Sequence, residues 1–184
     1  MNMATDNKLD RPRVVVTGIG AMSALGETPE ALWQGLVAGR SGIDKMTITD
    51  ATEFPCKFSG EVLDFNPTSY MDRKESRRMG RFSQFAVAAT SQALENAHLN
   101  LDKEDRERIG VVLGTGSGGY PETEQAVRTL VGRGGMKISP FYLPTMLCNM
   151  AAANVSRLNG LYGYTNTVVT ACAAGTQGIG EAAE

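Results

Sequence analysis

Three short apolar runs in this chain are each followed by a turn rich in glycine or alanine, and each turn leads into a segment with helical spacing. The runs cover residues 13–17, 109–113 and 165–171. Short runs rich in β-branched residues are typical of buried strands. Strands that alternate with helices across tight turns favour a largely parallel sheet. The pattern therefore predicts an α/β fold.

Apolar spacing and capping residues predict the helices that complete this pattern. Thr28, Pro29 and Glu30 together form a helix-start signal, because they supply an N-cap, a first-turn proline and an early acid. We expect helices over residues 28–39, 81–97, 122–131 and 145–158, and a further helix from Ala173 onward. Residues 42–70 show no sustained period, which predicts short strands and loops.

The two ends of the chain carry few structural signals. Residues 1–11 are polar, and we expect them to form a flexible tail ahead of one domain over residues 12–184. No capping signal precedes Glu184. We therefore expect the last helix to be cut short and the domain to be truncated at its C-terminal end.

The overall charge excludes some classes of partner. Lys plus Arg number 18 and Asp plus Glu number 20, which gives a net charge of −2. A nearly neutral chain gives no reason to expect a nucleic-acid partner. No apolar run approaches the roughly 20 residues that a membrane-spanning helix needs, so we expect no membrane partner either.

The cysteines indicate a reducing compartment. Cys56, Cys148 and Cys172 are odd in number and widely spaced, without a CxxC pair. This spacing argues against a disulfide framework and against a zinc site, so we expect no metal and a cytoplasmic location. Cys148 stands among apolar residues of a predicted helix, where core packing is the expected role.

One local stretch is strongly basic. Arg73, Lys74, Arg77 and Arg78 surround a single acid, Glu75. Such a stretch is commonly a solvated helix face. It is also suited to docking an acidic protein.

Cys172 lies where the third apolar run turns into a segment of very small residues. A sharp strand-to-helix turn presents its central side chain to an open cleft, as in the nucleophile elbow of serine hydrolases. The dipole of the following helix favours the thiolate by about 0.3–1 kcal/mol when exposed. A free cysteine is more often a small buried hydrophobe. Spacing alone leaves both interpretations open.

The glycine turn over residues 114–119 satisfies GxGxxG after a predicted strand, which is a weak dinucleotide-binding signal. The acid expected at the end of the following strand is missing, because residues 132–144 read as a loop. We therefore do not expect a nucleotide site.

The segment Thr170-Ala171-Cys172-Ala173-Ala174-Gly175 resembles the nucleophile segment of the β-ketoacyl-acyl-carrier-protein synthases, closest to the bacterial type II elongation enzymes. Other segments resemble motifs of this family in the same order along the chain: residues 14–20, 39–43, 73–75, 114–119, 137–141 and 149–150. The resemblance implies a thiolase-like fold of stacked layers (αβαβα), with this chain as its N-terminal half.

The resemblance also implies an activity. In this family the cysteine, here Cys172, accepts an acyl group from an acyl carrier protein. A malonyl unit on a second carrier is then decarboxylated, and its carbanion attacks the thioester in a Claisen condensation. No cofactor is expected. The family's enolate donors are two histidines and a lysine in the C-terminal half, so we expect this chain alone to be inactive.

Further residues take roles by resemblance. Ser117 and Phe141 would lie near the acyl pocket at the interface of a homodimer. Arg73, Lys74, Arg77 and Arg78 would dock the carrier protein. His98 is the one histidine in the chain and matches no catalytic motif of the family, so we expect a surface or structural role.

Three alternatives stay open. The chain can be a non-catalytic partner subunit, like the chain-length factors of polyketide synthases, although those usually lack the cysteine. It can be a standalone interaction domain without condensing activity. It can also belong to a thiolase or an acyl-CoA-dependent synthase of the same fold. Acyl-chain length, and fatty-acid against polyketide use, cannot be read from these residues.

Overall fold

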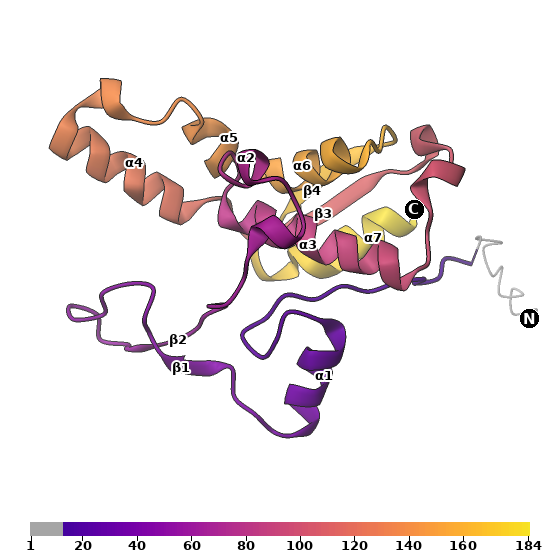
Figure 1. Ribbon diagram of the computed structural model, residues 1–184, viewed down its shortest axis with the longest axis horizontal. Coiled ribbons are helices and arrows are strands. Elements are labelled where there is room, and N and C mark those ends of the chain that lie inside the picture. Colours follow the sequence, from indigo (N-terminus) through magenta and orange to yellow (C-terminus); the bar gives the residue numbers. More distant parts are fainter. Residues whose placement is uncertain (1–12) are drawn as a thin grey trace, which may run out of the picture.

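The computed structural model describes residues 13–184, and the predicted flexible tail over residues 1–11 lies outside them. Figure 1 shows a two-stranded sheet between helices, with a helical arm extending to one side. The helices are α1 (Pro29–Val37), α2 (Arg73–Ser76), α3 (Arg81–Asn96), α4 (Tyr120–Arg133), α5 (Tyr142–Met146), α6 (Met150–Asn159) and α7 (Ala174–Ala183). The strands are β1 (Ile43–Lys45), β2 (Phe58–Gly60), β3 (Val111–Thr115) and β4 (Thr165–Val169).

The central sheet consists of β3 and β4, which pair in parallel with Val111 opposite Thr165 and Thr115 opposite Val169. The prediction of a parallel sheet with α/β alternation is confirmed for these two strands. The predicted excursion over residues 42–70 is also confirmed, since it contains only the short antiparallel pair of β1 and β2 and a turn of 3₁₀ helix.

Helices cover both faces of this sheet. Val111 and Leu113 point to one face, where they pack with residues of α6. Gly114 points to the other face, because successive strand residues alternate sides. There a Cβ at Gly114 would lie only 1.9 Å from the carbonyl oxygen of Ala174 in α7. The order of layers is therefore α6, sheet, α7, and α3 packs against α6.

The buried core lies between α3, α6 and β3. Its members are apolar side chains that are at most 9% exposed: Met71, Met79, Val87, Val111, Ala152, Val155 and Leu161. Small residues on α6 let α3 approach closely, as Ala151 and Ala152 are each 1% exposed. This packing fixes the position of β3 relative to α6.

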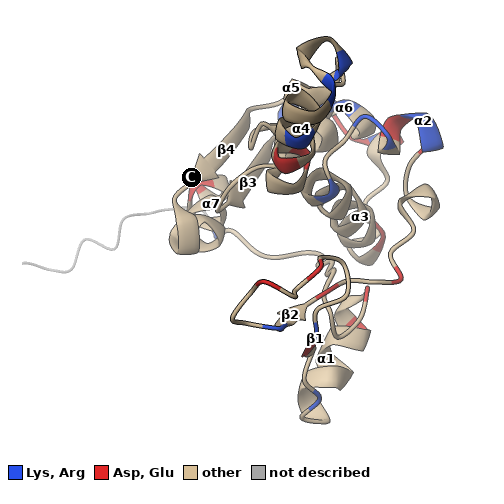
Figure 2. Cartoon of the chain, turned by 90° about the vertical axis from the view of Figure 1, so that its left-hand side faces the viewer, with Lys and Arg blue, Asp and Glu red and all other residues tan. Residues whose placement is uncertain are grey.

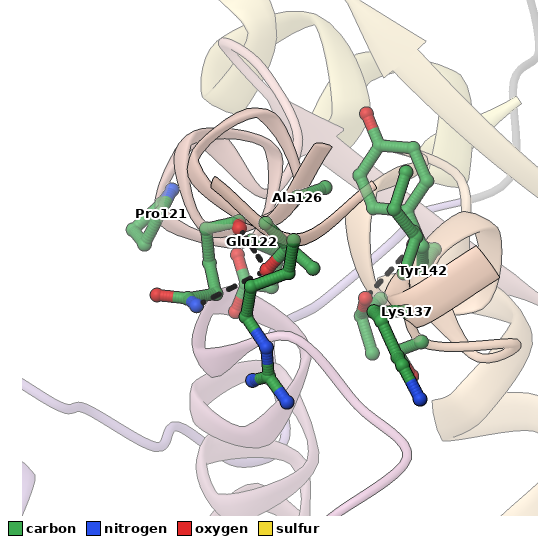
Figure 3. A pocket seen from close by; sticks show the side chains of 11 residues that line it. Pro121, Glu122, Ala126, Lys137 and Tyr142 are labelled. Carbon is green, nitrogen blue, oxygen red and sulfur yellow. Dashed lines mark hydrogen bonds between the residues drawn. The ribbon is translucent and has the colours of Figure 1, made fainter. Parts of the chain in front are cut away.

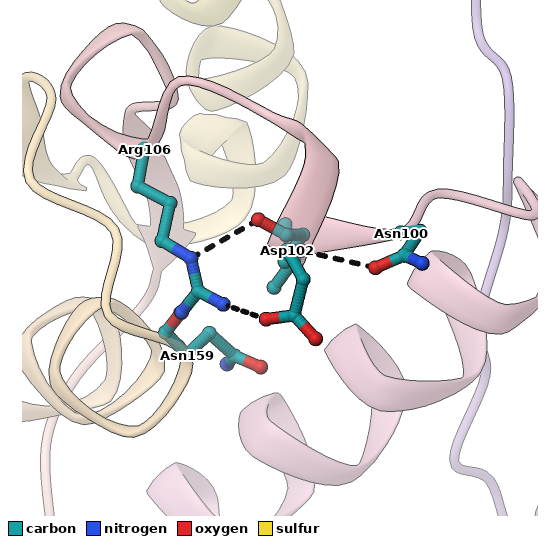
Figure 4. Close-up of polar contacts among 5 residues, drawn as sticks. Asn100, Asp102, Arg106 and Asn159 are labelled. Carbon is teal, nitrogen blue, oxygen red and sulfur yellow. Dashed lines mark hydrogen bonds and ion pairs between the residues drawn. The ribbon is translucent and has the colours of Figure 1, made fainter.

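The connection from α3 to β3 is held by Arg106 (Figure 4). Its guanidinium donates to the carbonyl oxygens of Leu101 at 3.1 Å and Asn159 at 3.0 Å. It also forms an ion pair with Asp102 at 2.6 Å. Arg106 thereby joins the segment before β3 to the C-terminal end of α6.

The predicted first strand, over residues 13–17, is wrong. The segment has no strand partner among the described residues, and Val14, Val15 and Val16 are 61–80% exposed. The residues that follow it run beside α3, where side-chain amides hold them. Asn96 accepts from the amide of Ile19 at 3.0 Å, and Gln92 accepts from the amide of Ala21 at 3.0 Å. A strand needs a neighbouring strand for its backbone hydrogen bonds, which this segment lacks.

The predicted helix over residues 145–158 is also wrong as a single element. It is divided into α5 and α6 by Leu147, Cys148 and Asn149, and Leu147 has extended dihedrals of φ −67° and ψ 132°. The break allows the carbonyl of Met146 to accept from the amide of Gly119 at 2.8 Å. Part of the expected loop before it, over residues 132–144, belongs to the ends of α4 and α5 and to a short 3₁₀ turn.

The other predicted elements are confirmed with small shifts of their boundaries. The helix expected over residues 81–97 is α3, and the helix expected over 122–131 is α4, which starts two residues earlier. The strand expected over residues 109–113 is β3, displaced by two residues toward the glycine turn.

Candidate active site

Cys172 lies in a single turn of 3₁₀ helix, Ala171–Ala173, between β4 and α7. Cys172 is exposed, as the prediction of an open nucleophile turn requires. The reversal is made at Ala171, which has a left-handed φ of 49°. A residue with a Cβ rarely adopts this conformation. At Ala171 it reverses the direction of the chain directly before Cys172.

Close backbone packing fixes the helix that follows Cys172. Gly114 of β3 meets the carbonyl of Ala174, and a Cβ at Gly178 of α7 would lie 2.9 Å from the amide nitrogen of Gly114. Any larger side chain at either glycine would push α7 away from the sheet. The two glycines therefore set the position of the first turn of α7, which begins directly after Cys172.

The glycine turn after β3 lies beside the cysteine turn. A Cβ at Gly116 would lie 3.8 Å from the Cα of Ala171. The next glycines are packed under the link between α5 and α6: Cβ atoms at Gly118 and Gly119 would lie 2.0 Å and 2.6 Å from the carbonyl oxygens of Met146 and Thr145. Gly118 and Gly119, like Gly114, are therefore required by close packing, whereas a Cβ at Gly116 would make only an ordinary contact.

Ser117 lines a cavity of about 350 Å³ beside this turn. The cavity is also lined by Leu147, Cys148 and Val169, the last residue of β4. Cys148, expected within a core helix, instead lies in the turn between α5 and α6 and is half-buried. The structure thus brings Ser117 and Cys148 to one cavity, whose lining includes Val169, a residue of the strand that precedes Cys172.

Phe141 is not among the residues that line this cavity. Its ring lies under the guanidinium of Arg78, with 4.9 Å between the guanidinium carbon and the ring centroid. The structure therefore connects Phe141 to the basic stretch, and its place near an acyl pocket stays a prediction.

A second cavity, of about 470 Å³, lies along the helical arm (Figure 3). Glu122 and Ala126 of α4 stand across it from Lys137 and Tyr142. Glu122 also accepts from the backbone amide of Arg81 at 3.2 Å, which ties α4 to the start of α3. None of its lining residues lies on β4 or α7, so this cavity is separate from the cysteine turn.

The basic stretch covers α2 and the two residues that follow it (Figure 2). All four cations, Arg73, Lys74, Arg77 and Arg78, are exposed, and in the described part of the chain none has an ion-pair partner. The neighbouring Ser76 and Met79 are buried, with exposed fractions of only 6% and 5%. The sequence did not show that Glu75 turns inward to pair with Arg157 of α6. The only sign of this ion pair in the sequence was a single acid, Glu75, within a basic stretch.

His98 caps the C-terminal end of α3. It is exposed, its φ is 52°, and its amide donates to the carbonyl of Glu95 at 2.9 Å. This is the left-handed position that closes many helices. The expected surface or structural role fits this placement.

Residues 13–184 contain no group of three or more His, Cys, Asp or Glu side chains that could hold a metal ion. Over the same residues, no helix combines the length and the apolar character that crossing a membrane requires.

Sequence comparison identifies relatives over almost the whole chain. Residues 11–184 match the family model of the β-ketoacyl synthase N-terminal domain. The 3-oxoacyl-[acyl-carrier-protein] synthase 2 of Synechocystis sp. is 45% identical over 174 residues, covering 95% of this chain and 42% of the relative. The enzyme of the same name from Vibrio harveyi is 42% identical over 175 residues, with the same coverage. The chain therefore spans about two fifths of the length of these curated relatives.

Solved structures agree in fold. The ishigamide ketosynthase/chain length factor matches with a TM-score of 0.84 at 29% identity, over 94% of this chain and 44% of that one. A β-ketoacyl synthase from Burkholderia phymatum matches with a TM-score of 0.75 at 32% identity, over 91% and 42%. A third match is a type II polyketide ketosynthase in complex with its acyl-carrier protein, with a TM-score of 0.77 at 25% identity, over 94% and 46%. The predicted thiolase-like α/β fold is thereby confirmed.

The ordered motifs, the parallel strand pair backed by α7 and the exposed cysteine at its turn agree with these matches. The resemblance inferred from the sequence is confirmed, and the chain belongs to the β-ketoacyl synthase family, of which it comprises the N-terminal domain.

Proposed function

We propose that the protein carrying this domain is a 3-oxoacyl-acyl-carrier-protein synthase that elongates fatty acids through an acyl thioester on Cys172. The observation that supports this most directly is the exposed thiol in a sharp turn between β4 and α7. A nucleophile needs access to a substrate carbonyl, and small neighbours at Ala173 and Ala174 leave room for that approach.

Two steps make up the proposed reaction. The Cys172 thiolate attacks the acyl thioester of the carrier, a new sulfur–carbon bond forms, and the carrier's thiol leaves. A malonyl thioester then loses carbon dioxide, and its carbanion attacks the Cys172 thioester, forming the carbon–carbon bond and releasing the Cys172 thiol.

Each step develops an oxyanion that needs hydrogen-bond donors. The backbone amide of Cys172 is the proposed first donor. The amide of Ala173 is already engaged, because it donates to the carbonyl of Thr170 at 3.1 Å. His98 caps a helix, so the donors for the decarboxylation step are expected outside these residues.

The proposal includes partners. An acidic acyl carrier protein would dock on the exposed cations of α2, and the protein would act as a homodimer with β4 near the two-fold axis. In support of the dimer, β4 pairs only with β3 among the described residues, which leaves its other edge open. Three free cysteines fit a reducing cytoplasm.

The test uses the native polypeptide that carries this sequence, purified from its source cell. Incubation with acyl-loaded carrier should add one acyl group, which peptide mapping by mass spectrometry should place on Cys172. The Cys172→Ala variant should lose acylation altogether. Acylation retained in that variant would disprove the assignment of the nucleophile.

A non-condensing partner subunit is the second candidate, supported by the match to a ketosynthase/chain length factor structure. Adding malonyl-loaded carrier to the acylated protein separates the two. Release of a 3-oxoacyl product supports the synthase, whereas a stable acyl-Cys172 without product supports the partner subunit.

A further inference from the structure

The basic stretch begins on α2, which is a very short helix. The helix contains only the four residues Arg73–Ser76, and a helix of this length is not stable by itself in water. Its orientation must therefore come from contacts with the rest of the molecule. The same contacts decide where its cations point.

One set of contacts holds the C-terminal end of α2. The side-chain amide of Gln84 in α3 donates to the carbonyl oxygen of Ser76 at 2.8 Å. The Ser76 hydroxyl donates to the carbonyl oxygen of Arg73 at 3.0 Å, and Met79 is buried directly afterwards. The Gln84 contact and the burial of Met79 hold this end of α2 against α3.

The second contact is the ion pair between Glu75 and Arg157. The Glu75 side chain is only 22% exposed, although its sequence neighbours Lys74 and Arg77 are exposed. Arg157 comes from α6, 82 residues further along the chain, and its guanidinium also donates to the buried Asn154 at 3.3 Å. The arginine is therefore held on its own helix while it holds Glu75.

Electrostatics agree with this arrangement. The hydrogen bond from Arg157 lowers the pKa of Glu75 below its ordinary value of 4.5, with smaller contributions from Arg78 and Lys74. The carboxylate therefore stays charged at neutral pH. Its charge is directed inward to α6, while the four neighbouring cations remain free toward solvent.

We propose that Glu75 and Arg157 are positioning residues for carrier docking: their ion pair sets the rotation of α2 so that its cations face an acidic partner. This inference rests on the proposed function, because it takes the acyl carrier protein as that partner. The contact itself would involve the four cations and not Glu75.

The sign of one substitution separates positioning from simple charge. Glu75→Gln removes a negative charge from among four cations, so charge alone predicts tighter binding of an acidic carrier and a lower KM. Loss of the ion pair predicts the opposite, because α2 would no longer be held in one rotation. We expect the KM for the acyl carrier to rise about 3- to 10-fold with kcat changed by less than about twofold.

Asp72→Asn is the matched control. It removes the same charge one residue before α2, from an exposed side chain that makes no capping hydrogen bond to the helix. Charge alone then acts without any change in anchoring, and we expect the KM for the carrier to stay within about twofold of wild type or to fall. Arg157→Lys keeps the charge of the partner but loses the guanidinium, whose Nη2 donates to both Glu75 and Asn154, so it should give an intermediate KM.

All variants are made in the complete native protein, with folding checked by thermal unfolding and the Cys172 site checked by its alkylation rate. A raised KM in Glu75→Gln together with an unaltered or lowered KM in Asp72→Asn supports the positioning role. A wild-type or lowered KM in both Glu75→Gln and Arg157→Lys overturns it while leaving the proposed function intact. Absence of carrier-dependent turnover in the wild-type protein overturns both.

Discussion

Two residues other than glycine adopt left-handed dihedrals in the described chain, Ala171 and His98. Each carries a Cβ that crowds the backbone in this conformation, at a cost of about 1–2 kcal/mol. Neither position could be read from the sequence, because glycine is the usual signal for such a turn and neither residue is glycine. The Cys172 turn was predicted from its context, whereas the sharp reversal at Ala171 was not.

His98→Gly should stabilise the protein by about 0.5–1 kcal/mol, because glycine closes the end of α3 without the strain of a Cβ. The free energy of unfolding in urea measures the effect. Ala97→Gly is the control, since Ala97 has an ordinary helical φ of −73° and its replacement should destabilise by a similar amount. A loss of stability in His98→Gly would show that the imidazole itself contributes at this position.

Among the secondary-structure elements, β3 and α7 pack closely against each other, and the candidate active site depends on this packing. Gly114 faces the Ala174 carbonyl, and Gly178 of α7 faces back toward Gly114. The sequence predicted a glycine turn after β3, but Gly114 lies inside the strand. Its role in packing depends on which helix lies opposite, and that is information about tertiary structure that periodicity does not carry.

Gly114→Ala should destabilise the protein by about 1–3 kcal/mol or more, because the added methyl would overlap the backbone of α7. It should also slow acylation of Cys172, since α7 begins directly after that residue. Unfolding in urea and the acylation rate by mass spectrometry measure the two effects. The control is Gly132→Ala in α4, where the new methyl group would meet no heavy atom within 4 Å. The higher helix propensity of alanine should stabilise the protein by about 0.5–1 kcal/mol there. Equal behaviour of the two variants would contradict the packing argument.

At the scale of the whole molecule, the sequence predicted the α/β class, the order of most elements and the turn that exposes Cys172, because those depend on local periodicity and on ordered motifs. It failed where the outcome depends on distant partners. Residues 13–17 have the composition of a strand but no strand partner among the described residues, and the residues after them are held by α3. The helix predicted over residues 145–158 is broken at Leu147, and the break allows the carbonyl of Met146 to accept from the amide of Gly119, which is distant in the sequence.

Charge follows the same logic, since the net charge of −2 gave no sign of an anionic partner. What matters is its distribution: four exposed cations lie together on α2 and the two residues after it, without ion-pair partners in the described chain. A docking surface of this kind acts over about 10 Å at 0.1 M salt and is screened at higher ionic strength. Carrier recognition should therefore depend on salt even though the chain as a whole is almost neutral.

We expect the KM of the complete protein for acyl carrier to rise several-fold between about 0.05 M and about 0.5 M salt, while alkylation of Cys172 by a small neutral reagent stays unchanged. In Arg73→Gln/Lys74→Gln the KM should be higher at low salt and its salt dependence flatter, because fewer charges remain to be screened. The control Lys45→Gln/Lys103→Gln removes two exposed cations from other elements and should keep the wild-type slope. Equal slopes in all three proteins would show that α2 is not the docking surface, and the carrier would then have to bind elsewhere on the complete enzyme.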